Sequence, residues 1–202
     1  MKDIIKISRK QKVKAADTLA LAFMENDPLA CWFYPNSNTR YRELLDYFLF
    51  RVSYGLKFGE VYTTSDKFEG VAIWLPGKYS EITSWRGMIT GGMKLFSSSR
   101  EMMRTFYIVS HYTTEFRNNL IQPPYIQLSP IGVKPEHQGK GFGSKLLKPM
   151  LRKFDEEKST CFLETQTKSN IPIYEKLGFK IVNEGTIPEA NLAHWGMIRE
   201  PK

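Results

Sequence analysis

A glycine-rich stretch at residues 133–147, VKPEHQGKGFGSKLL, limits the possible folds of this chain more than any other feature. It follows an apolar run and precedes a segment with helical spacing, which predicts a turn from a strand into a helix. The first amides of a helix lack carbonyl partners, and the peptide dipoles make that end partly positive. Glycines at positions 139, 141 and 143 keep side chains away from these amides and allow positive φ angles. The turn is therefore expected to bind a diphosphate.

Two commoner phosphate-binding motifs do not match this turn. The P-loop needs four residues between its glycine and the Gly-Lys pair, whereas six residues separate Gly132 from Gly139 here. The dinucleotide fingerprint GxGxxG would need a glycine where Ser144 stands. A glycine-rich turn that merely connects a strand to a helix remains an alternative when the turn is considered alone.

The composition is typical of one soluble globular domain. The chain has 202 residues, of which 42% are hydrophobic and 25% charged, and no run of eighteen apolar residues. The charged amino terminus does not resemble a secretory signal, so we expect a cytoplasmic protein that does not cross a membrane. Cys31 and Cys161 lie far apart without a CxxC motif, which predicts buried apolar thiols rather than a disulfide or a metal site.

The net charge is positive but diffuse. The 29 basic and 21 acidic residues give +8, which favours anionic ligands. The basic residues are scattered, and no zinc-finger or RNA-recognition motif is present, so nucleic acid is not the expected partner. A small phosphate-bearing ligand agrees better with this pattern.

Hydrophobic periodicity predicts a mixture of strands and helices along the whole chain. The expected strands are residues 4–7, 60–64, 70–75, 126–133 and 161–166, and the expected helices are 12–24, 40–57, two within 78–120, and 144–155. Residues 25–28 are expected to form a turn. The strand at 126–133 contains Pro130, which cannot donate a ladder hydrogen bond and therefore predicts a bulge or a splay there.

The segment 78–120 carries two stripes of Met and aromatic residues at helical spacing. Such stripes are more typical of core packing than of a ligand site, although Met-rich surfaces also adapt to varied ligands. We expect a helical cover with a secondary role in substrate choice. The stripes consist of Trp85, Met88, Ile89 and Met93, and of Met102, Phe106, Val109, Phe116 and Leu120.

The whole run from Val133 to Leu147 resembles the acetyl-CoA-binding motif of the Gcn5-related N-acetyltransferase family. The core of that motif, Q/R-x-x-G-x-G/A, is matched by Gln138, Gly141 and Gly143. A second match follows at the usual distance, with ETQ at 164–166 and then N-x-x-x-Y-x-x-x-G-F at 170–179. The resemblance covers about 125–200, while residues 23–35 and the AIWLPG strand resemble a branch that includes puromycin N-acetyltransferase-like proteins.

The resemblance implies an α/β (α+β) fold, the acyl-CoA N-acyltransferase-like fold. Its sheet is mixed and mostly antiparallel, contains a splayed strand pair and is flanked by helices. We expect residues 1–202 to form a single N-acetyltransferase domain with a helical insertion at about 78–120. The implied reaction is direct transfer of an acetyl group from acetyl-CoA to a primary amine of a small molecule or peptide, without a metal. We expect the protein to be a monomer or a homodimer.

The resemblance also implies which residues bind the co-substrate. Backbone amides of Ile131 and Val133 would hold the pantetheine arm and polarise the thioester carbonyl, with ordinary strand pairing as the alternative role. Asn170 would bind the amide chain of the cofactor, or cap a helix, or do both. The amides that would cradle the pyrophosphate are those of Gln138, Gly139, Lys140, Gly141, Phe142, Gly143 and Ser144, and the Lys140 side chain would either add charge or stay solvated.

Two residues are the catalytic candidates. Tyr174 lies where the family places a hydroxyl near the departing sulfur, so it would act as the general acid; the alternative is simple packing. Glu164 interrupts an uncharged strand and is the candidate general base, with a structural hydrogen bond or ion pair as the alternative. The histidines at 111, 137 and 194 are isolated in the sequence and receive no role.

The function has alternatives that the sequence leaves open. The same fold could transfer another acyl group or use an oxygen acceptor, or the chain could be a non-catalytic CoA-binding regulatory module. Tyr174 and Asn170 argue against the module, because a binder does not need an acid near the sulfur. The acceptor pocket is expected from residues 25–35 and 78–120, where no motif identifies the acceptor.

Overall fold

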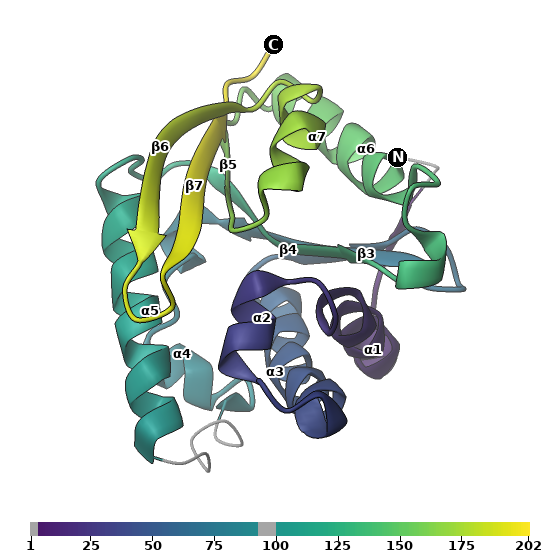
Figure 1. The fold of residues 1–202 in the computed structure, drawn as a ribbon. Helices are drawn as coiled ribbons and strands as arrows, with labels where there is room; N and C mark the ends of the chain where they lie inside the picture. Colours follow the sequence, from purple (N-terminus) through teal and green to yellow (C-terminus); the bar gives the residue numbers. More distant parts are fainter. Residues whose placement is uncertain (1–3, 93–99) are drawn as a thin grey trace.

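In the computed structural model, which describes residues 4–92 and 100–202, strands and helices alternate around one twisted sheet (Figure 1). The sheet order is β1-β2-β3-β4-β5-β7-β6. All neighbouring strands pair antiparallel except β4 and β5, which run parallel. The strands are β1 (Ile5–Lys6), β2 (Glu60–Thr63), β3 (Gly70–Pro76), β4 (Ile126–Val133), β5 (Cys161–Thr165), β6 (Lys180–Ile187) and β7 (Leu192–Arg199).

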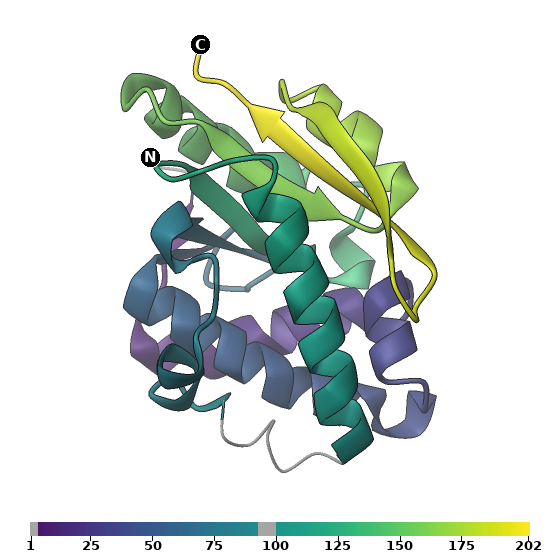
Figure 2. The ribbon, with the colours of Figure 1, turned by 90° about the vertical axis from the view of Figure 1, so that its left-hand side faces the viewer.

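Helices cover both faces of the sheet. In Figure 1, α6 and α7 lie above the central strands and α1, α2 and α3 lie below them, while α5 runs along the side near β6. Figure 2 shows the length of α5 crossing in front of the strands. The α-helices are α1 (Lys12–Phe23), α2 (Pro28–Phe33), α3 (Ser37–Phe58), α4 (Ser84–Met88), α5 (Arg100–Asn118), α6 (Phe142–Glu156) and α7 (Ile171–Glu175).

The alternation of side chains along β3 joins two hydrophobic cores. Val71, Ile73 and Leu75 pack into the core made with α1 and α3, whereas Ala72 and Trp74 pack into the core made with α6. Successive strand residues point to opposite faces, so a strand covered by helices on both faces is apolar throughout. The GVAIWLP sequence of β3 meets this requirement.

The predicted fold class is confirmed: the structure has a mixed, mostly antiparallel seven-stranded sheet flanked by helices. The predicted splay is also present. The parallel β4–β5 pairing ends at Leu128 and Leu163, and the register of β3 against β4 shifts between Ala72 and Trp74, opposite Ser129 and Pro130. The two central strands therefore separate beyond Leu128.

Several predicted details are wrong. Residues 28–33 form α2 instead of a simple turn, because Asp27 caps the helix by accepting from the Ala30 amide at 2.7 Å and Pro28 occupies its first turn. α6 begins at Phe142, two residues before the predicted start, since Gly141 adopts the N-cap position. Cys31 is only half-buried, whereas Cys161 is buried as expected.

The stripe expected to pack in the core between 78 and 92 faces outward. Trp85 is 65% exposed and Met88 is 46% exposed, because α4 is only a five-residue helix and presents this side to solvent. Met93, the last member of the stripe, lies outside the described residues. On α5, Val109 and Phe116 are buried as the second stripe predicts.

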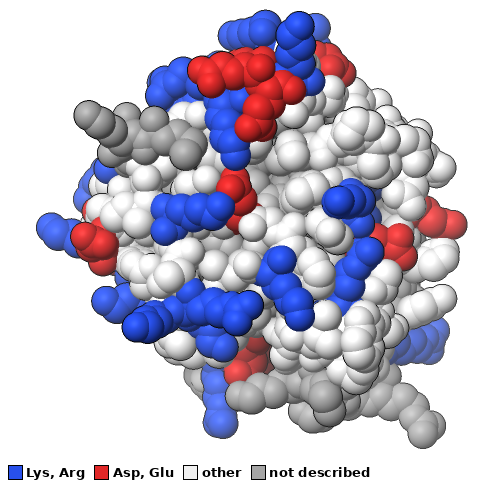
Figure 3. Space-filling model, turned by 180° about the vertical axis from the view of Figure 1, so that it is seen from behind, with Lys and Arg blue, Asp and Glu red and all other residues white. Residues whose placement is uncertain are grey.

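The surface charges agree with the diffuse pattern of the sequence. On the face opposite to the view of Figure 1, Lys and Arg side chains form separate groups with uncharged surface between them, and acidic residues lie within the uppermost group (Figure 3). Within the described ranges, no helix combines the length and apolarity that a membrane crossing would require.

Candidate active site

The glycine-rich turn before α6 has the predicted backbone conformation. Gly139 and Gly141 have φ angles of 73° and 83°, in the left-handed region that glycine adopts without steric cost. A Cβ atom added at Gly139, Gly141 or Gly143 would meet nothing within 4 Å. The turn is therefore an open backbone surface at the positive end of a fifteen-residue helix.

Six consecutive amides of this turn have no acceptor. Among the hydrogen bonds of the described chain, none uses an amide from Gly139 to Ser144, whereas the Gln138 amide donates to the Pro135 carbonyl at 3.2 Å. The predicted amide cradle is consequently shorter by one residue at its start. Unpaired amides at a helix N-terminus suit an anion, so the residues present fit the diphosphate of acetyl-CoA.

Two side chains stabilise the turn from outside. Gln138 donates through Nε2 to the carbonyl of Val133 at 3.0 Å, and Lys140 donates through Nζ to the carbonyl of Glu136 at 2.8 Å. The glutamine of the sequence motif thus connects the loop back to the end of β4. Lys140 folds onto the loop, which keeps its positive charge beside the unpaired amides.

The end of β4 presents two further amides toward the splay. The Lys134 amide donates to the Glu69 carbonyl at 2.9 Å, which fixes the alternation of bonded and non-bonded residues against β3. By this alternation, the amides of Ile131 and Val133 point away from β3, toward the gap where β5 has diverged. This orientation supports the predicted contact with the pantetheine arm over simple strand pairing.

Tyr174 and Asn170 lie on the other side of the gap, at α7. Tyr174 is 9% exposed, and burial alone raises the pKa of its hydroxyl to about 12, with no hydrogen-bond partner contributing. The Asn170 side chain does not cap α7, which removes the alternative role expected from the sequence. Both residues line the same cavity, so their polar groups are available to a ligand.

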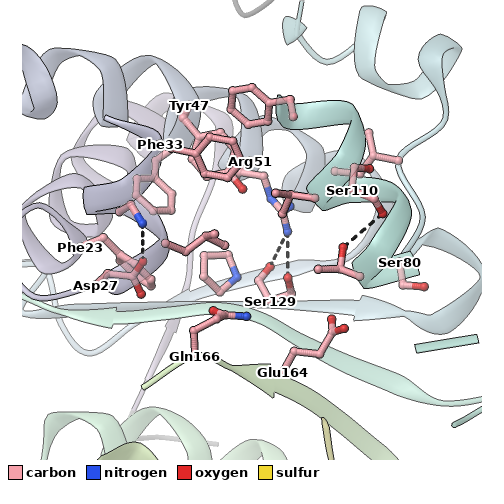
Figure 4. Close-up of a pocket in the computed structure, with 18 of the residues that line it drawn as sticks. Phe23, Asp27, Phe33, Tyr47, Arg51, Ser80, Ser110, Ser129, Glu164 and Gln166 are labelled. Atoms are coloured by element: carbon pink, nitrogen blue, oxygen red, sulfur yellow. Dashed lines mark hydrogen bonds between the residues drawn. The ribbon is translucent and has the colours of Figure 1, made fainter. Parts of the chain in front are cut away.

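This cavity has a volume of about 550 Å³ and extends from the splay to the helices below the sheet. Figure 4 shows the rings of Phe33 and Tyr47 on the helical side, with Glu164 and Gln166 on the strand side. Its size lies in the range of small-molecule sites. The aromatic residues that line it are Phe23, Phe33, Tyr34, Tyr47, Phe48, Phe50, Phe106, Tyr107 and Tyr174.

The walls come from the two predicted segments and from further elements of the fold. Residues of 25–35 and of 78–120 contribute, as expected, but α3 and the strands β4 and β5 contribute as well. Asp27, the N-cap of α2, also lines the cavity, and burial raises the pKa of its carboxyl. The cavity therefore has charged groups at two ends and an apolar body between them.

Glu164 is the centre of a polar network on the strand side of the cavity. Its Oε2 atom accepts from Gln127 Nε2 at 3.0 Å and from the Arg117 guanidinium at 3.4 Å. The Oε1 atom lies 3.3 Å from Nε2 of His194. Both roles considered from the sequence are compatible with this geometry, since the carboxylate is ion-paired and also lines the cavity.

His194 is a site residue that the sequence did not reveal. It is fully buried, and its Nδ1 lies 2.7 Å from Nε2 of Gln166. Because the amide nitrogen is the donor in this contact, Nδ1 accepts and the ring proton is on Nε2, which then donates to Glu164. The sequence carries no local signal for this contact, because it arises from the pairing of β5 with β7, where Thr165 faces Trp195 and residue 194 lies next to Gln166.

Comparisons with known proteins agree with this geometry. A family model described as an acetyltransferase (GNAT) domain matches residues 106–181, which include the glycine-rich turn and Tyr174. The chain is 27% identical over 182 residues to an uncharacterised N-acetyltransferase of Schizosaccharomyces pombe, covering 86% of this chain and 72% of that protein. The match to the family model thus includes the turn that is expected to bind the co-substrate.

Solved structures show the same fold at low sequence identity. A histone acetyltransferase HPA2 and related acetyltransferase from Corynebacterium glutamicum has a TM-score of 0.66 at 20% identity, covering 98% of this chain and 96% of that one. A putative arylalkylamine N-acetyltransferase 7 from the yellow fever mosquito has a TM-score of 0.64 at 12% identity, covering 98% and 87%.

The narrower resemblance to puromycin N-acetyltransferase-like proteins stays a prediction. The family model, the yeast relative and the shared fold agree with the motifs read from the sequence. This agreement supports assignment to the Gcn5-related N-acetyltransferase (GNAT) family, as an acyltransferase with an acetyl transfer function.

Proposed function

We propose that this protein is an acetyl-CoA-dependent N-acetyltransferase that acetylates the primary amine of a small molecule. One observation carries the proposal: a single cavity is lined by Ile131 and Tyr174, by Glu164 on its strand side, and by aromatic rings on its helical side. Donor and acceptor would thus meet at the splay between β4 and β5. The cavity volume of about 550 Å³ lies in the range of small-molecule sites, which supports a small molecule as acceptor.

The co-substrate would be bound mainly by backbone groups. The amides of Gly139 to Ser144 would hold the diphosphate, and Ile131 and Val133 would donate to the pantetheine arm and the thioester carbonyl. Asn170 would bind the amide chain. Acetyl-CoA supplies an acetyl group activated as a thioester, and donors aimed at its carbonyl oxygen stabilise the charge that develops there during attack.

Glu164 would accept the proton that an ammonium must lose before it becomes a nucleophile, directly or through a water molecule. His194 and Gln127 would hold the carboxylate in position by donating to it. The new bond joins the amine nitrogen to the acetyl carbon, and the bond that breaks joins this carbon to sulfur. The acceptor nitrogen thereby becomes an amide.

Tyr174 would protonate the departing thiolate. A general acid must be protonated at the working pH, and the pKa of about 12 keeps this hydroxyl protonated throughout the physiological range. A hydroxyl that makes no hydrogen bond to the described residues, yet lines the cavity, is suited to donate to sulfur instead.

The aromatic walls support amines with an apolar body as acceptors. The mosquito structure of the same fold is named as a putative arylalkylamine N-acetyltransferase, which is consistent with an acceptor of this class. Aromatic rings contribute large apolar contact areas and specific ring geometries. We therefore place arylalkylamines and aromatic amino acids first in an acceptor panel.

The test is release of free thiol from acetyl-CoA across that panel, with the acetylated product identified by mass spectrometry. We expect turnover with at least one aromatic amine and none with the corresponding alcohol. Saturable binding of acetyl-CoA without turnover on any amine would instead favour the non-catalytic module. Absence of acetyl-CoA binding by folded protein would overturn the proposal.

A further inference from the structure

Arg51 is a cation of the cavity that the proposed chemistry does not use. It projects from α3 and reaches across to β4, where Nη2 donates to the carbonyl of Ser129 at 3.2 Å and to its hydroxyl at 2.9 Å (Figure 4). The Nε atom is buried and has no hydrogen-bond partner. The guanidinium also lies 6.0 Å from the centre of the Tyr47 ring. Arg51 thus keeps a hydrogen-bond donor, Nε, that no described group uses.

The other charged groups of the cavity are already engaged. Arg117 pairs with Glu164, and Asp27 accepts from the first turn of α2. No carboxylate among the described side chains lies within 4.0 Å of Arg51. Several other Lys, Arg and His side chains of the chain do have a carboxylate within that distance. Arg51 is half-buried and its Nε atom is fully buried without a partner, so an anionic ligand would complete this part of the cavity.

The surroundings of Arg51 define the rest of that ligand. Phe33 and Phe106 stack at 4.5 Å on the helical side, and Tyr47 lies 6.3 Å from Phe106. These rings favour an apolar or aromatic body. A guanidinium presents parallel N–H groups that match the two oxygens of a carboxylate. The cavity thus combines an apolar wall with a single site for an acid group.

We propose that Arg51 binds a carboxylate of the small-molecule substrate, and that the acceptor is an amino acid with an aromatic side chain. This inference rests on the proposed function and narrows its acceptor. Ser129, which Arg51 contacts, is the first residue beyond the β4–β5 pairing. In an α-amino acid the amine and the carboxylate share one carbon, so a carboxylate on Arg51 leaves the amine close to the splay, where transfer would occur.

The first test uses the unaltered protein and does not depend on turnover. In the presence of CoA, calorimetry compares 3-phenylpropionate with 3-phenylpropionamide, which differ in charge and hardly in shape. We expect the carboxylate to bind at least about tenfold more tightly, because hydrogen bonds between charged groups are stronger than neutral ones. Equal affinities would overturn the inference, even if the protein acetylates amines.

The second test changes Arg51 itself. Arg51→Gln keeps a donor for Ser129 but removes the charge, and Arg51→Lys keeps the charge without the planar fork. For phenylalanine as acceptor, we expect the KM of Arg51→Gln to rise about tenfold or more, with a smaller rise for Arg51→Lys. For phenethylamine, which lacks the carboxylate, the rise in KM should be several-fold smaller than for phenylalanine. Unchanged acetyl-CoA affinity shows that the variants are folded.

The carboxylate could alternatively belong to the acyl group. Turnover with succinyl-CoA and butyryl-CoA, measured with phenethylamine, separates the two sources. A preference for succinyl-CoA that is lost in Arg51→Gln would assign the carboxylate to the donor and would contradict the amino acid acceptor. If no acceptor releases thiol while 3-phenylpropionate still binds through Arg51, the proposed function fails and the carboxylate site stands.

Discussion

The glycine-rich turn before α6 and the cavity beside α3 form the two halves of the site, and they are made from different parts of the polypeptide. The turn offers six backbone amides from consecutive residues, Gly139 to Ser144. The cavity offers side chains from helices and strands that are far apart in the sequence. Backbone recognition suits an invariant group such as a diphosphate, whereas side chains can be exchanged to suit different acceptors. This contrast yields four predictions that test the two halves separately.

The largest effect is expected where the two halves meet. Tyr174→Phe should lower kcat about 100-fold or more, since general acid catalysis contributes at least that much. The Kd for acetyl-CoA should change less than about twofold, because the proposed role concerns the leaving sulfur. Steady-state kinetics and calorimetry measure the two quantities.

Tyr62→Phe is the matched control for that variant. Tyr62 is also buried, but it packs in the core with α6 and does not line the cavity. It should leave kcat unchanged. Equal turnover of Tyr174→Phe and the unaltered protein would remove Tyr174 from the mechanism. Tyr174 would then contribute only packing between the two halves of the site.

The backbone half should be sensitive to conformation more than to side-chain chemistry. Gly141→Val places a branched residue at a φ of 83°, and the left-handed region costs about 1–2 kcal/mol for a residue with a Cβ. The free turn should relax out of this conformation and have to recover it on binding, so we expect the Kd for acetyl-CoA to rise about fivefold to thirtyfold, measured by calorimetry.

Gly91→Val carries the same strain outside the turn, at a φ of 94° and with open space around the added atoms. Both variants should lose similar stability in thermal unfolding, but only Gly141→Val should lose affinity. A similar loss of affinity in the two would mean that strain acts globally and that the turn is not the binding surface.

The side-chain half should respond more weakly and only in the acceptor. Tyr107 lines the cavity although it is 68% exposed, so Tyr107→Ser removes a contact without disturbing the core. The KM of an aromatic acceptor should rise about twofold to tenfold, as expected for one aromatic contact. Acetyl-CoA affinity should stay the same.

Trp85→Ser provides the comparison, because Trp85 is 65% exposed and does not line the cavity. It should leave the KM of the acceptor unchanged. An equal effect of both variants would indicate a general influence of surface aromatic residues instead of a defined acceptor wall.

The smallest effect concerns pH. Burial raises the pKa of Tyr174 from 10.0 to about 12, so its hydroxyl stays protonated up to about pH 10. Since the acid form is the active one, kcat should stay nearly constant between about pH 8 and pH 10. A loss of half the activity near pH 10 that disappears in Tyr174→Phe would show an unshifted tyrosine.

The two halves of the site differ in how far the sequence predicts them. The interruption of β4 at Pro130 predicted the splay, and the spacing of Gly139 and Gly141 predicted an open turn, because both effects act through local backbone rules. The prediction that the stripe at Trp85 packs in the core was wrong, since periodicity cannot tell which side of a short helix meets the core. α2 could have been found from Asp27 and Pro28, which are standard helix-start signals.

The sequence by itself predicted the conformation of the co-substrate turn, the interruption of β4 and the resemblance to the family. These properties depend on neighbouring residues, whose φ angles, unpaired amides and hydrophobic periodicity are local. Only the tertiary structure decided that His194 donates to Glu164 and that Arg51 reaches Ser129, because residues from separate elements meet only after strand register and helix packing bring them together. The acceptor half is therefore a property of packing, which no single stretch of this chain specifies.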